Sequence, residues 1–227
     1  MIESDSRRLT NNRWGAPEDE KLTSGVYLAQ NSSFGWYWNR PEPKIKLGAD
    51  CLKPIYPNVR SGGSPWDPSN SVYFPIRLTD IKTLQFDVTY NYTTPPTGSY
   101  NLAYDMFLSD TNQPDSSPKP KAEVMIWLHW TFPQPPSTYK GDFTDGNNTY
   151  ELYSWVMSDG RQYYSFALKE QTQLKAQLTV NARRLVDNLP LDPNWYVHGV
   201  ELGNEVVNGS GEIEISQFNV NLNGHEL

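Results

Sequence analysis

Short segments in which apolar and polar residues alternate dominate the chain, and this is the pattern of a β-strand with one buried face. Residues 83–90 show it most clearly, because Leu84, Phe86, Val88 and Tyr90 fall on one side and polar residues on the other. Clusters of Gly, Pro, Asn and Asp separate the segments and predict turns between them. Further strands are predicted at residues 25–28, 34–38, 45–47, 101–108, 123–130, 150–157, 162–168, 195–207 and 212–222.

Three segments depart from simple alternation. Residues 57–68 contain so many Gly, Pro, Ser and Asn residues that we predict a loop. Residues 179–189 place apolar side chains three and four positions apart and are followed by Pro190, which predicts a short amphipathic helix. In residues 212–222 the apolar positions change from odd to even numbers, so we predict a β-bulge near residues 216–217.

These elements predict an all-β protein, a jelly-roll β-sandwich of two antiparallel sheets with a single short α-helix. A chain of 227 residues can form one β domain of this kind, so we predict a single domain over residues 1–227. The charged residues 1–10 are expected to be frayed. The strands at residues 101–108 and 123–130 are expected to pair as a hairpin with a long connection.

Composition narrows the range of partners. The formal net charge is −7 and the isoelectric point is near 5.0. This argues against nucleic acid, because proteins that bind phosphate backbones concentrate Lys and Arg on one face. A neutral substrate fits the charge better, and the 8 Trp and 14 Tyr residues supply rings for a binding surface.

Other composition features exclude further classes of site. No apolar run reaches membrane-spanning length, so we expect no membrane partner, and we expect a monomer. The single cysteine, Cys51, excludes an intrachain disulfide and a thiolate metal cluster, and the three His residues lack metal-ligand spacing. We therefore expect no metal and no cofactor. The Asn-X-Ser/Thr sequons are compatible with secretion, which is the localisation we expect.

The strand at residues 121–130 carries the first candidate for chemistry. Its alternation places Glu123, Met125, Trp127 and His129 on one face. A carboxylate beside a thioether and an indole is costly to bury, so it either lies at the floor of a groove or is held there for chemistry. The opposite face is apolar and consists of Val124, Ile126, Leu128 and Trp130.

A second candidate strand lies at residues 196–205. One of its faces combines Glu201 and Glu205 with Gly199 and Gly203, whose missing side chains would let a flat ligand approach the backbone. Cleavage of a glycosidic bond needs two carboxyl groups, one to protonate the leaving oxygen and one to attack the anomeric carbon or activate water. The two strands together therefore suggest a glycosidase.

Four motifs in the same order along the chain resemble those of glycoside hydrolase family 12, the small jelly-roll β-glucanases and xyloglucanases. Residues 122–128 resemble the nucleophile strand of that family, and residues 200–205 resemble its acid/base strand. Residues 11–15 are similar to the N-terminal substrate-binding motif, and residues 103–107 are similar to the strand whose aspartate contacts the nucleophile. The resemblance spans nearly the whole chain.

The resemblance implies a role for each matching residue. Glu123 would be the nucleophile, Glu205 the general acid/base, and Asp105 the hydrogen-bonding partner of Glu123. Met125 would pack beneath the site of an open substrate cleft. The family retains anomeric configuration, which requires carboxyl oxygens about 5 to 5.5 Å apart. The residues implied or expected to contact substrate in that cleft are Asn12, Trp14, Tyr56, Trp127 and, from its shared face, His129.

The expected activity is that of a retaining endo-acting hydrolase of β-1,4-glucans, and three alternatives remain open. Glu201 shares the face of Glu205 and could be the acid instead. Loops at residues 56–66 and 132–139 are long enough to form pockets for the branches of xyloglucan, so a xyloglucan-specific enzyme is one alternative. A non-catalytic carbohydrate-binding jelly roll would also carry aromatic residues in its cleft, but it would not need two facing carboxylates and Asp105.

Overall fold

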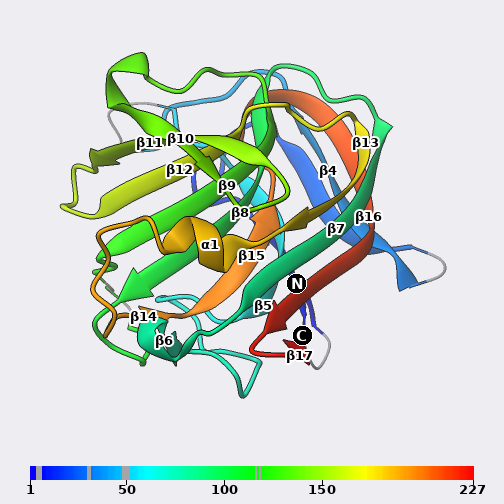
Figure 1. The fold of residues 1–227 in the computed structure, drawn as a ribbon. Helices are drawn as coiled ribbons and strands as arrows, with labels where there is room; N and C mark the ends of the chain where they lie inside the picture. Colours follow the sequence, from blue (N-terminus) through cyan, green and yellow to red (C-terminus); the bar gives the residue numbers. More distant parts are fainter. Residues whose placement is uncertain (4–6, 30–31, 48–51, 116, 118) are drawn as a thin grey trace.

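Two β-sheets packed face to face form the framework of the protein (Figure 1). The computed structural model describes residues 1–3, 7–29, 32–47, 52–115, 117 and 119–227. The first sheet, here called the cleft sheet, contains, in spatial order, β1 (Ile2–Glu3), β2 (Arg8–Asn12), β5 (Tyr56–Gly62), β15 (Gly199–Gly203), β8 (Ser99–Ser109), β9 (Ala122–Trp130), β12 (Gln162–Leu168), β11 (Thr149–Val156) and β10 (Tyr139–Thr144).

The second sheet, here called the outer sheet, covers one face of the cleft sheet. Its strands in spatial order are β3 (Thr23–Leu28), β4 (Phe34–Arg40), β16 (Val206–Leu222), β7 (Leu84–Thr94) and β13 (Lys175–Val180). The remaining elements are β6 (Ile76–Arg77), β14 (Tyr196–Val197), β17 (His225–Glu226), α1 (Ala182–Val186) and the 3-10 helices η2 (Leu78–Asp80) and η3 (Pro136–Thr138). The predicted all-β sandwich is confirmed, with one difference: β9 and β12 pair in parallel.

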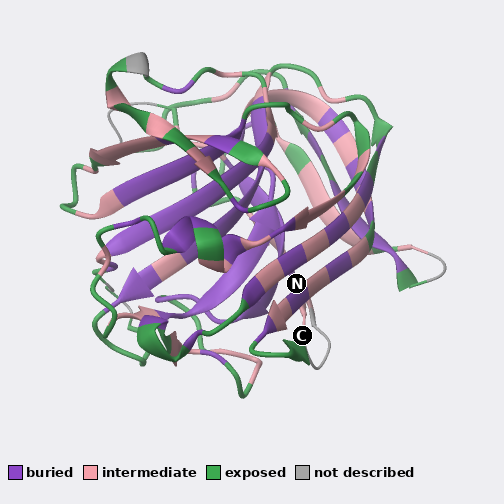
Figure 2. Cartoon of the chain, viewed as in Figure 1, coloured by how far each residue is buried: buried purple, intermediate pink, exposed green. Residues whose placement is uncertain are grey.

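The hydrophobic core fills the space between the sheets. The ring of Tyr104 on β8 lies 4.6 Å from Phe86 on β7 and 6.4 Å from Phe218 on β16, measured between ring centres. Figure 2 shows the consequence: β7 alternates between buried and partly exposed residues, whereas β8, β9 and β15 are buried along almost their whole length. In these three strands the residues that face away from the core are therefore also mostly buried.

Several predicted strands and the predicted bulge are present. Residues 101–108 and 123–130 do pair as antiparallel neighbours in β8 and β9. The ladder between β16 and β7 shifts register between Ile215 and Gln217, so Ser216 is the extra residue of the predicted bulge. The predicted strand at residues 45–47 is wrong, because these residues form no strand.

The prediction of a loop over residues 57–68 was wrong in its first half, because residues 56–62 form the central strand β5. This strand pairs with β2 on one side and β15 on the other, and all seven of its residues are buried. Two backbone ladders outweigh the weak strand preference of Pro57 and Asn58. The turn begins only at Gly62, whose φ of 89° favours glycine.

Two further expectations need correction. Residues 8–10 are not frayed, because they belong to β2 and pair with β5, and residues 2–3 form β1 against β2. The helix is limited to Ala182–Val186, since Thr179 and Val180 instead continue β13 against β7. Asn181 ends that strand and caps the helix by accepting a hydrogen bond from the Arg184 backbone N–H. Within the described residues, no helix is long and apolar enough to cross a membrane.

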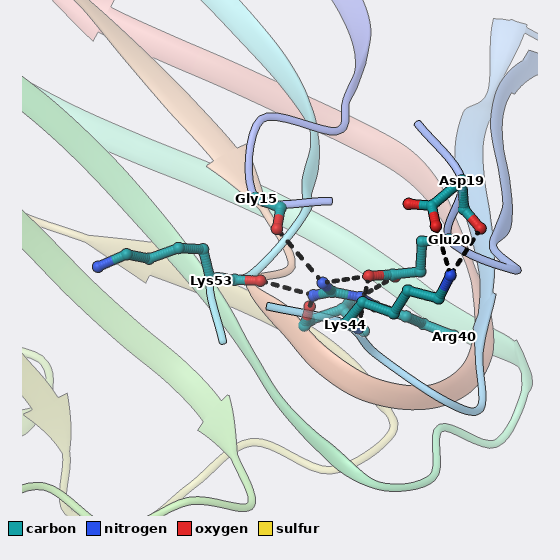
Figure 3. A network of polar contacts seen from close by, with 7 residues as sticks. Gly15, Asp19, Glu20, Arg40, Lys44 and Lys53 are labelled. Carbon is teal, nitrogen blue, oxygen red and sulfur yellow. Dashed lines mark hydrogen bonds and ion pairs between the residues drawn. The ribbon is translucent and has the colours of Figure 1, made fainter. Parts of the chain in front are cut away.

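A buried ion pair between Arg40 and Glu20 joins the N-terminal loop to the strands (Figure 3). Arg40 Nε lies 2.6 Å from Glu20 Oε1, and neither side chain is exposed. The same guanidinium donates hydrogen bonds to the carbonyl oxygens of Lys53 at 2.7 Å, Val206 at 3.0 Å and Gly15 at 3.5 Å. One cation thus connects three segments that are distant in the sequence.

Replacement of Glu20 by Gln is expected to lower the free energy of unfolding by about 3 to 5 kcal/mol, because it leaves the Arg40 charge buried and uncompensated. Urea denaturation of the two proteins measures the difference. Asp19→Asn is the matched control, because Asp19 pairs with Lys44 at the exposed surface, 2.6 Å away, and its loss should leave the denaturation midpoint unchanged. Equal midpoints for Glu20→Gln and wild type would contradict the structural importance of the pair.

Candidate active site

A cleft of about 560 Å³ crosses the exposed side of the cleft sheet. Strands β2, β5, β15, β8 and β9 form its floor, and loop residues form its walls. The strand residues that line it are Thr10, Asn12, Tyr56, Asn58, Arg60, Asp105, Phe107, Glu123 and Glu201, with Glu205 just after β15. The loop residues are Trp14, Ser64, Trp66, Asp67, Asp159 and Arg161.

Four carboxyl groups meet in this cleft because neighbouring strands present them on the same face. Asp105 on β8 lies opposite Glu201 on β15 in one ladder, and opposite Met125 on β9 in the other. Glu123 precedes Met125 by two residues and therefore shares its face. Glu205 follows β15, and its backbone N–H donates to the side chain of Asn101. The sequence-predicted carboxyls Asp105, Glu123 and Glu205 are thus brought together.

Glu123 is almost completely buried, with 8% of its surface exposed, and it forms an ion pair. Arg161 Nη1 lies 3.2 Å from Glu123 Oε2. Arg161 directly precedes β12, whose parallel pairing with β9 places Tyr163 beside Glu123. The nucleophile candidate therefore has a cation as its direct neighbour.

Glu205 and Glu201 have different partners. The side-chain amide of Asn101 donates to Glu205 Oε2 at 2.5 Å, so the contact to Glu205 comes from a neutral group. Glu201 instead lies 3.2 Å from the guanidinium of Arg60. An arginine bound to Glu201 stabilises its ionised form, which favours Glu205 over Glu201 as the proton donor.

Burial raises the pKa values of the carboxyls in the cleft, because the charged form loses contact with water. Burial raises the pKa of Glu205 to about 7, against a lowering by the Asn101 hydrogen bond. Burial also raises the pKa of Glu123 to about 7, which Arg161 opposes and Glu205 reinforces. Burial and the charge of Glu123 raise the pKa of Asp105 well above its ordinary value.

Asp105 lies in the centre of this group but not in the predicted hydrogen bond. It is 5% exposed, and its Oδ1 has no hydrogen-bond partner among the described residues. Its influence on Glu123 is therefore exerted through proximity, and its raised pKa favours a protonated carboxyl that can donate a hydrogen bond.

Met125 and Tyr163 form the base of the site. Met125 is 1% exposed, as expected of a residue that packs beneath the cleft, and its Sδ accepts a hydrogen bond of 3.0 Å from the Tyr163 hydroxyl. Gly203 leaves no space for a ligand, because a Cβ there would lie 2.8 Å from the Tyr56 ring. The interpretation of that glycine as a place for ligand approach was wrong.

Two of the predicted substrate contacts are not in the cleft. Trp127 is 3% exposed and is covered by Phe132, whose ring meets it edge-on at 5.0 Å. The Nδ1–H of His129 donates to the Thr172 carbonyl, 2.8 Å away, and its ring stacks on Tyr100 in the space between the sheets. The predictions for both residues were wrong.

A β-bulge explains the position of His129. The ladder between β8 and β9 shifts register between Leu102 and Ala103, which pair with His129 and Trp127 respectively. The extra residue in β9 reverses the parity of the positions after it. His129 therefore turns towards the core, and Trp130 lies on the side of Trp127, 6.1 Å from its ring.

The other predicted contacts do line the cleft. Trp14 is 47% exposed, and Asn12 holds its loop by accepting a hydrogen bond from the Trp14 backbone N–H at 3.1 Å. Tyr56 is buried in the floor, and its hydroxyl donates to the Ala103 carbonyl at 3.1 Å. Trp14 thus exposes enough of its ring to stack on a sugar, whereas Tyr56 is buried and exposes little of its ring.

Sequence analysis missed the two arginines of the cleft. Arg60 was overlooked because β5 was predicted to be a loop, although the alternation of Tyr56, Asn58 and Arg60 with Val59 was a signal for a strand. Arg161 had no such signal, since it stands in a turn and its contact with Glu123 depends on the pairing of β9 and β12. No group of three or more His, Cys, Asp or Glu side chains in the described part of the chain is arranged to hold a metal ion.

Comparison with known proteins agrees with this geometry. The sequence model of Glycosyl hydrolase family 12 matches residues 6–223. Endoglucanase S of Pectobacterium parmentieri is 28% identical over 225 residues, which cover 94% of this chain and 81% of that protein. The inactive glycoside hydrolase XLP1 of Phytophthora nicotianae is 26% identical over 205 residues, 88% of this chain and 76% of that protein.

Solved structures show the same architecture. A family 12 xyloglucanase from Bacillus licheniformis, in complex with ligand, has a TM-score of 0.82 at 28% identity over 97% of this chain and 94% of its own. Endoglucanase cel12A from Rhodothermus marinus has a TM-score of 0.76 at 21% identity, over 98% of this chain and 93% of its own, and shares the fold. The predicted resemblance is confirmed, and the chain belongs to glycosyl hydrolase family 12.

Proposed function

We propose that the protein is a retaining endo-β-1,4-glucanase that cleaves internal β-1,4-glucosidic bonds of plant cell-wall glucans. The observation that carries the proposal is the pair Glu123 and Glu205 in one cleft, the first bound to a cation and the second to a neutral amide. Two carboxyls in different environments can take the different roles that glycoside hydrolysis requires. The names of relatives, an endoglucanase and a xyloglucanase, support the same class of substrate.

In this mechanism Glu205 begins protonated and gives its proton to the oxygen of the leaving sugar, while Glu123 attacks the anomeric carbon. The second step reverses the roles: Glu205 removes a proton from water, and that water displaces Glu123 from the glycosyl-enzyme intermediate. The ordering needs Glu205 to hold its proton when Glu123 is already ionised. The difference in partners favours this order, because Glu123 contacts the Arg161 cation and Glu205 contacts the neutral Asn101 amide.

Endo action is supported by two exposed aromatic residues that line the cleft. Trp14 and Trp66 are 47% and 46% exposed and belong to separate loops. A glucan that crosses the cleft could stack on both, which would place an internal bond at the carboxyls. Plant cell-wall glucans lie outside the cell, so we also propose that the enzyme is secreted. We propose that it acts as a monomer on neutral glucan.

Two alternatives have an observation in their favour. The likeness to a xyloglucanase at 28% identity favours a preference for xyloglucan over plain glucans. The likeness to a protein named as an inactive glycoside hydrolase at 26% identity favours a chain that binds glucan without cleaving it. The presence of both carboxyls in the cleft supports catalysis instead.

Glu123→Gln and Glu205→Gln are each expected to reduce polysaccharide cleavage at least about a hundredfold, because the first removes the nucleophile and the second removes the general acid/base. A reducing-sugar assay on carboxymethyl cellulose, mixed-linkage glucan and xyloglucan measures the loss and also identifies the preferred glucan. Glu170→Gln is the control, because Glu170 is exposed and outside the cleft.

Small-nucleophile rescue separates the two roles. With Glu123→Ala and an activated aryl cellobioside, azide should restore turnover and give the α-glycosyl azide, since one inversion remains. With Glu205→Ala it should give the β-azide, since both inversions remain. The opposite stereochemistry would reverse the assignment of Glu123 and Glu205, and unimpaired cleavage by either Gln variant would exclude that residue from catalysis.

Glu205→Gln is expected to stabilise the protein at pH 8. Burial raises the pKa of Glu205 from 4.5 to about 7, so the folded state holds the proton more tightly than the unfolded state, and stability is lost as pH rises through that interval. Removal of the charge should raise the free energy of unfolding by about 1 to 3 kcal/mol at pH 8. Thermal unfolding should show a Tm a few degrees above wild type at pH 8 and no gain at pH 4; equal Tm values at pH 8 would contradict the burial of an ionisable Glu205.

A further inference from the structure

The two arginines of the cleft bind in the same pattern. Each guanidinium bridges one buried carboxylate and one exposed aspartate. Arg60 lies 3.2 Å from Glu201 and 3.1 Å from Asp67. Arg161 lies 3.2 Å from Glu123 and 3.6 Å from Asp159, whose side chain is 56% exposed. Of the four carboxyls at the cleft floor, Glu123 and Glu201 therefore touch an arginine and Asp105 and Glu205 do not.

Arg161 is held in place on several sides. Its side chain is only 14% exposed, and its guanidinium carbon lies 5.5 Å from the centre of the Phe107 ring. Phe107 is the ladder partner of Glu123 on β8, and the Trp66 ring meets Phe107 edge-on at 5.0 Å. The cation therefore rests on an aromatic face, and its position relative to Glu123 is fixed by packing.

We propose that Arg161 is a positioning residue for Glu123: it orients Oε2 and makes Glu123, and not Asp105 or Glu205, the carboxyl that carries the negative charge before reaction. This inference rests on the proposed function, because it concerns the nucleophile of that reaction. It explains why, among several neighbouring carboxyl groups in the cleft, Glu123 is the one that is ionised.

The groups that face Glu123 leave Arg161 as the stabilising charge. From β8 comes Asp105, and from β15 and the residues after it come Glu201 and Glu205. Each of these carboxyls would repel a charge on Glu123. Arg60, the other arginine that lines the cleft, is bound to Glu201.

On the β12 side, the neighbours are Asp159 and Tyr163. Asp159 would also repel the charge of Glu123, but it binds Arg161 at its outer edge. Tyr163 directs its hydroxyl to Met125 Sδ and adds no charge. Contact with Arg161 thus favours ionised Glu123, while the carboxyl of Glu205 accepts a hydrogen bond from the neutral amide of Asn101.

The alternative is that Arg161 only attaches the turn at residues 157–160 to the sheet. A structural role of this kind would lower stability and activity by the same factor at every pH. A positioning role moves the titration of Glu123, because loss of a nearby opposite charge raises the pKa of a carboxyl. The two roles are distinguished by pH dependence.

The first measurement titrates Glu123 directly. Protein labelled with ¹³C at the glutamate side-chain carboxyl is followed by NMR from pH 4 to pH 9, and the Glu123 signal is assigned from its absence in Glu123→Gln. In Arg161→Met the titration midpoint is expected to rise by about one pH unit or more. In Arg161→Lys, which keeps the charge but not the planar fork, it should lie between wild type and Arg161→Met.

The second measurement uses hydrolysis of 2,4-dinitrophenyl β-cellobioside, whose leaving group needs no proton, so the acid limb of kcat/KM reports the nucleophile. The ratio of kcat/KM at pH 5 to kcat/KM on the alkaline plateau should be about tenfold lower for Arg161→Met than for wild type, in line with the displaced midpoint. Arg77→Met is the matched control: Arg77 also lies over a ring, that of Tyr196 at 5.3 Å, but outside the cleft. Its profile should equal that of wild type.

An unchanged Glu123 midpoint in Arg161→Met overturns the proposal, and so does an equal loss of activity at all pH values. If Arg161→Met does not fold, Arg161→Lys decides: a midpoint equal to that of wild type with an unchanged pH profile would overturn it. If the wild-type protein hydrolyses no glucan or aryl glycoside while the NMR midpoint still shifts, the proposed function fails but the charge assignment to Glu123 holds.

Discussion

The constraint that organises this protein is the burial of several carboxyl groups side by side in one cleft. An ionised carboxylate removed from water is unfavourable unless cations or hydrogen-bond donors compensate it. Strand β5 brings Arg60 to Glu201. The turn that leads into β12 brings Arg161 to Glu123. Within the described residues, Glu205 accepts a hydrogen bond from the neutral Asn101 amide and Asp105 Oδ1 has no hydrogen-bond partner, so both carboxyls favour their protonated forms. The pairing of strands therefore determines where charge resides.

The sandwich supplies what this arrangement needs from the rest of the chain. Strands β8, β9 and β15 have the outer sheet behind them and the cleft in front, so almost all of their residues are buried. Burial on both faces fixes the register and keeps the carboxyls adjacent. It also removes them from bulk water, which raises the pKa values of Glu123 and Glu205. Burial of these strands on both faces thus both fixes their register and raises the pKa values of the cleft carboxyls.

Sequence alone predicted what depends on a regular two-residue period. The faces of residues 84–90 and the position of Glu123 in the cleft follow from alternation within single strands. Sequence alone failed where the structure of a segment depends on a strand that is distant in the sequence. β5 is a strand because β2 and β15 pair with its two edges, and Arg161 reaches Glu123 because β9 and β12 pair in parallel. It also failed at His129, where one extra residue in β9 reverses the faces, a change that the local residue pattern does not reveal.

The buried Arg40 also has a consequence for how the cleft can vary. Its guanidinium holds the carbonyl of Gly15, next to Trp14, and that of Val206, next to Glu205. Arg40 therefore fixes the backbone beside both Trp14, the proposed sugar-stacking residue, and Glu205, the proposed proton donor. Insertions or deletions in the connecting segments could accumulate without altering the alignment of sugar and acid, provided that each carbonyl still reached the same nitrogen atoms. The buried contacts of Arg40, more than the surface loops, therefore determine the distance between Trp14 and Glu205.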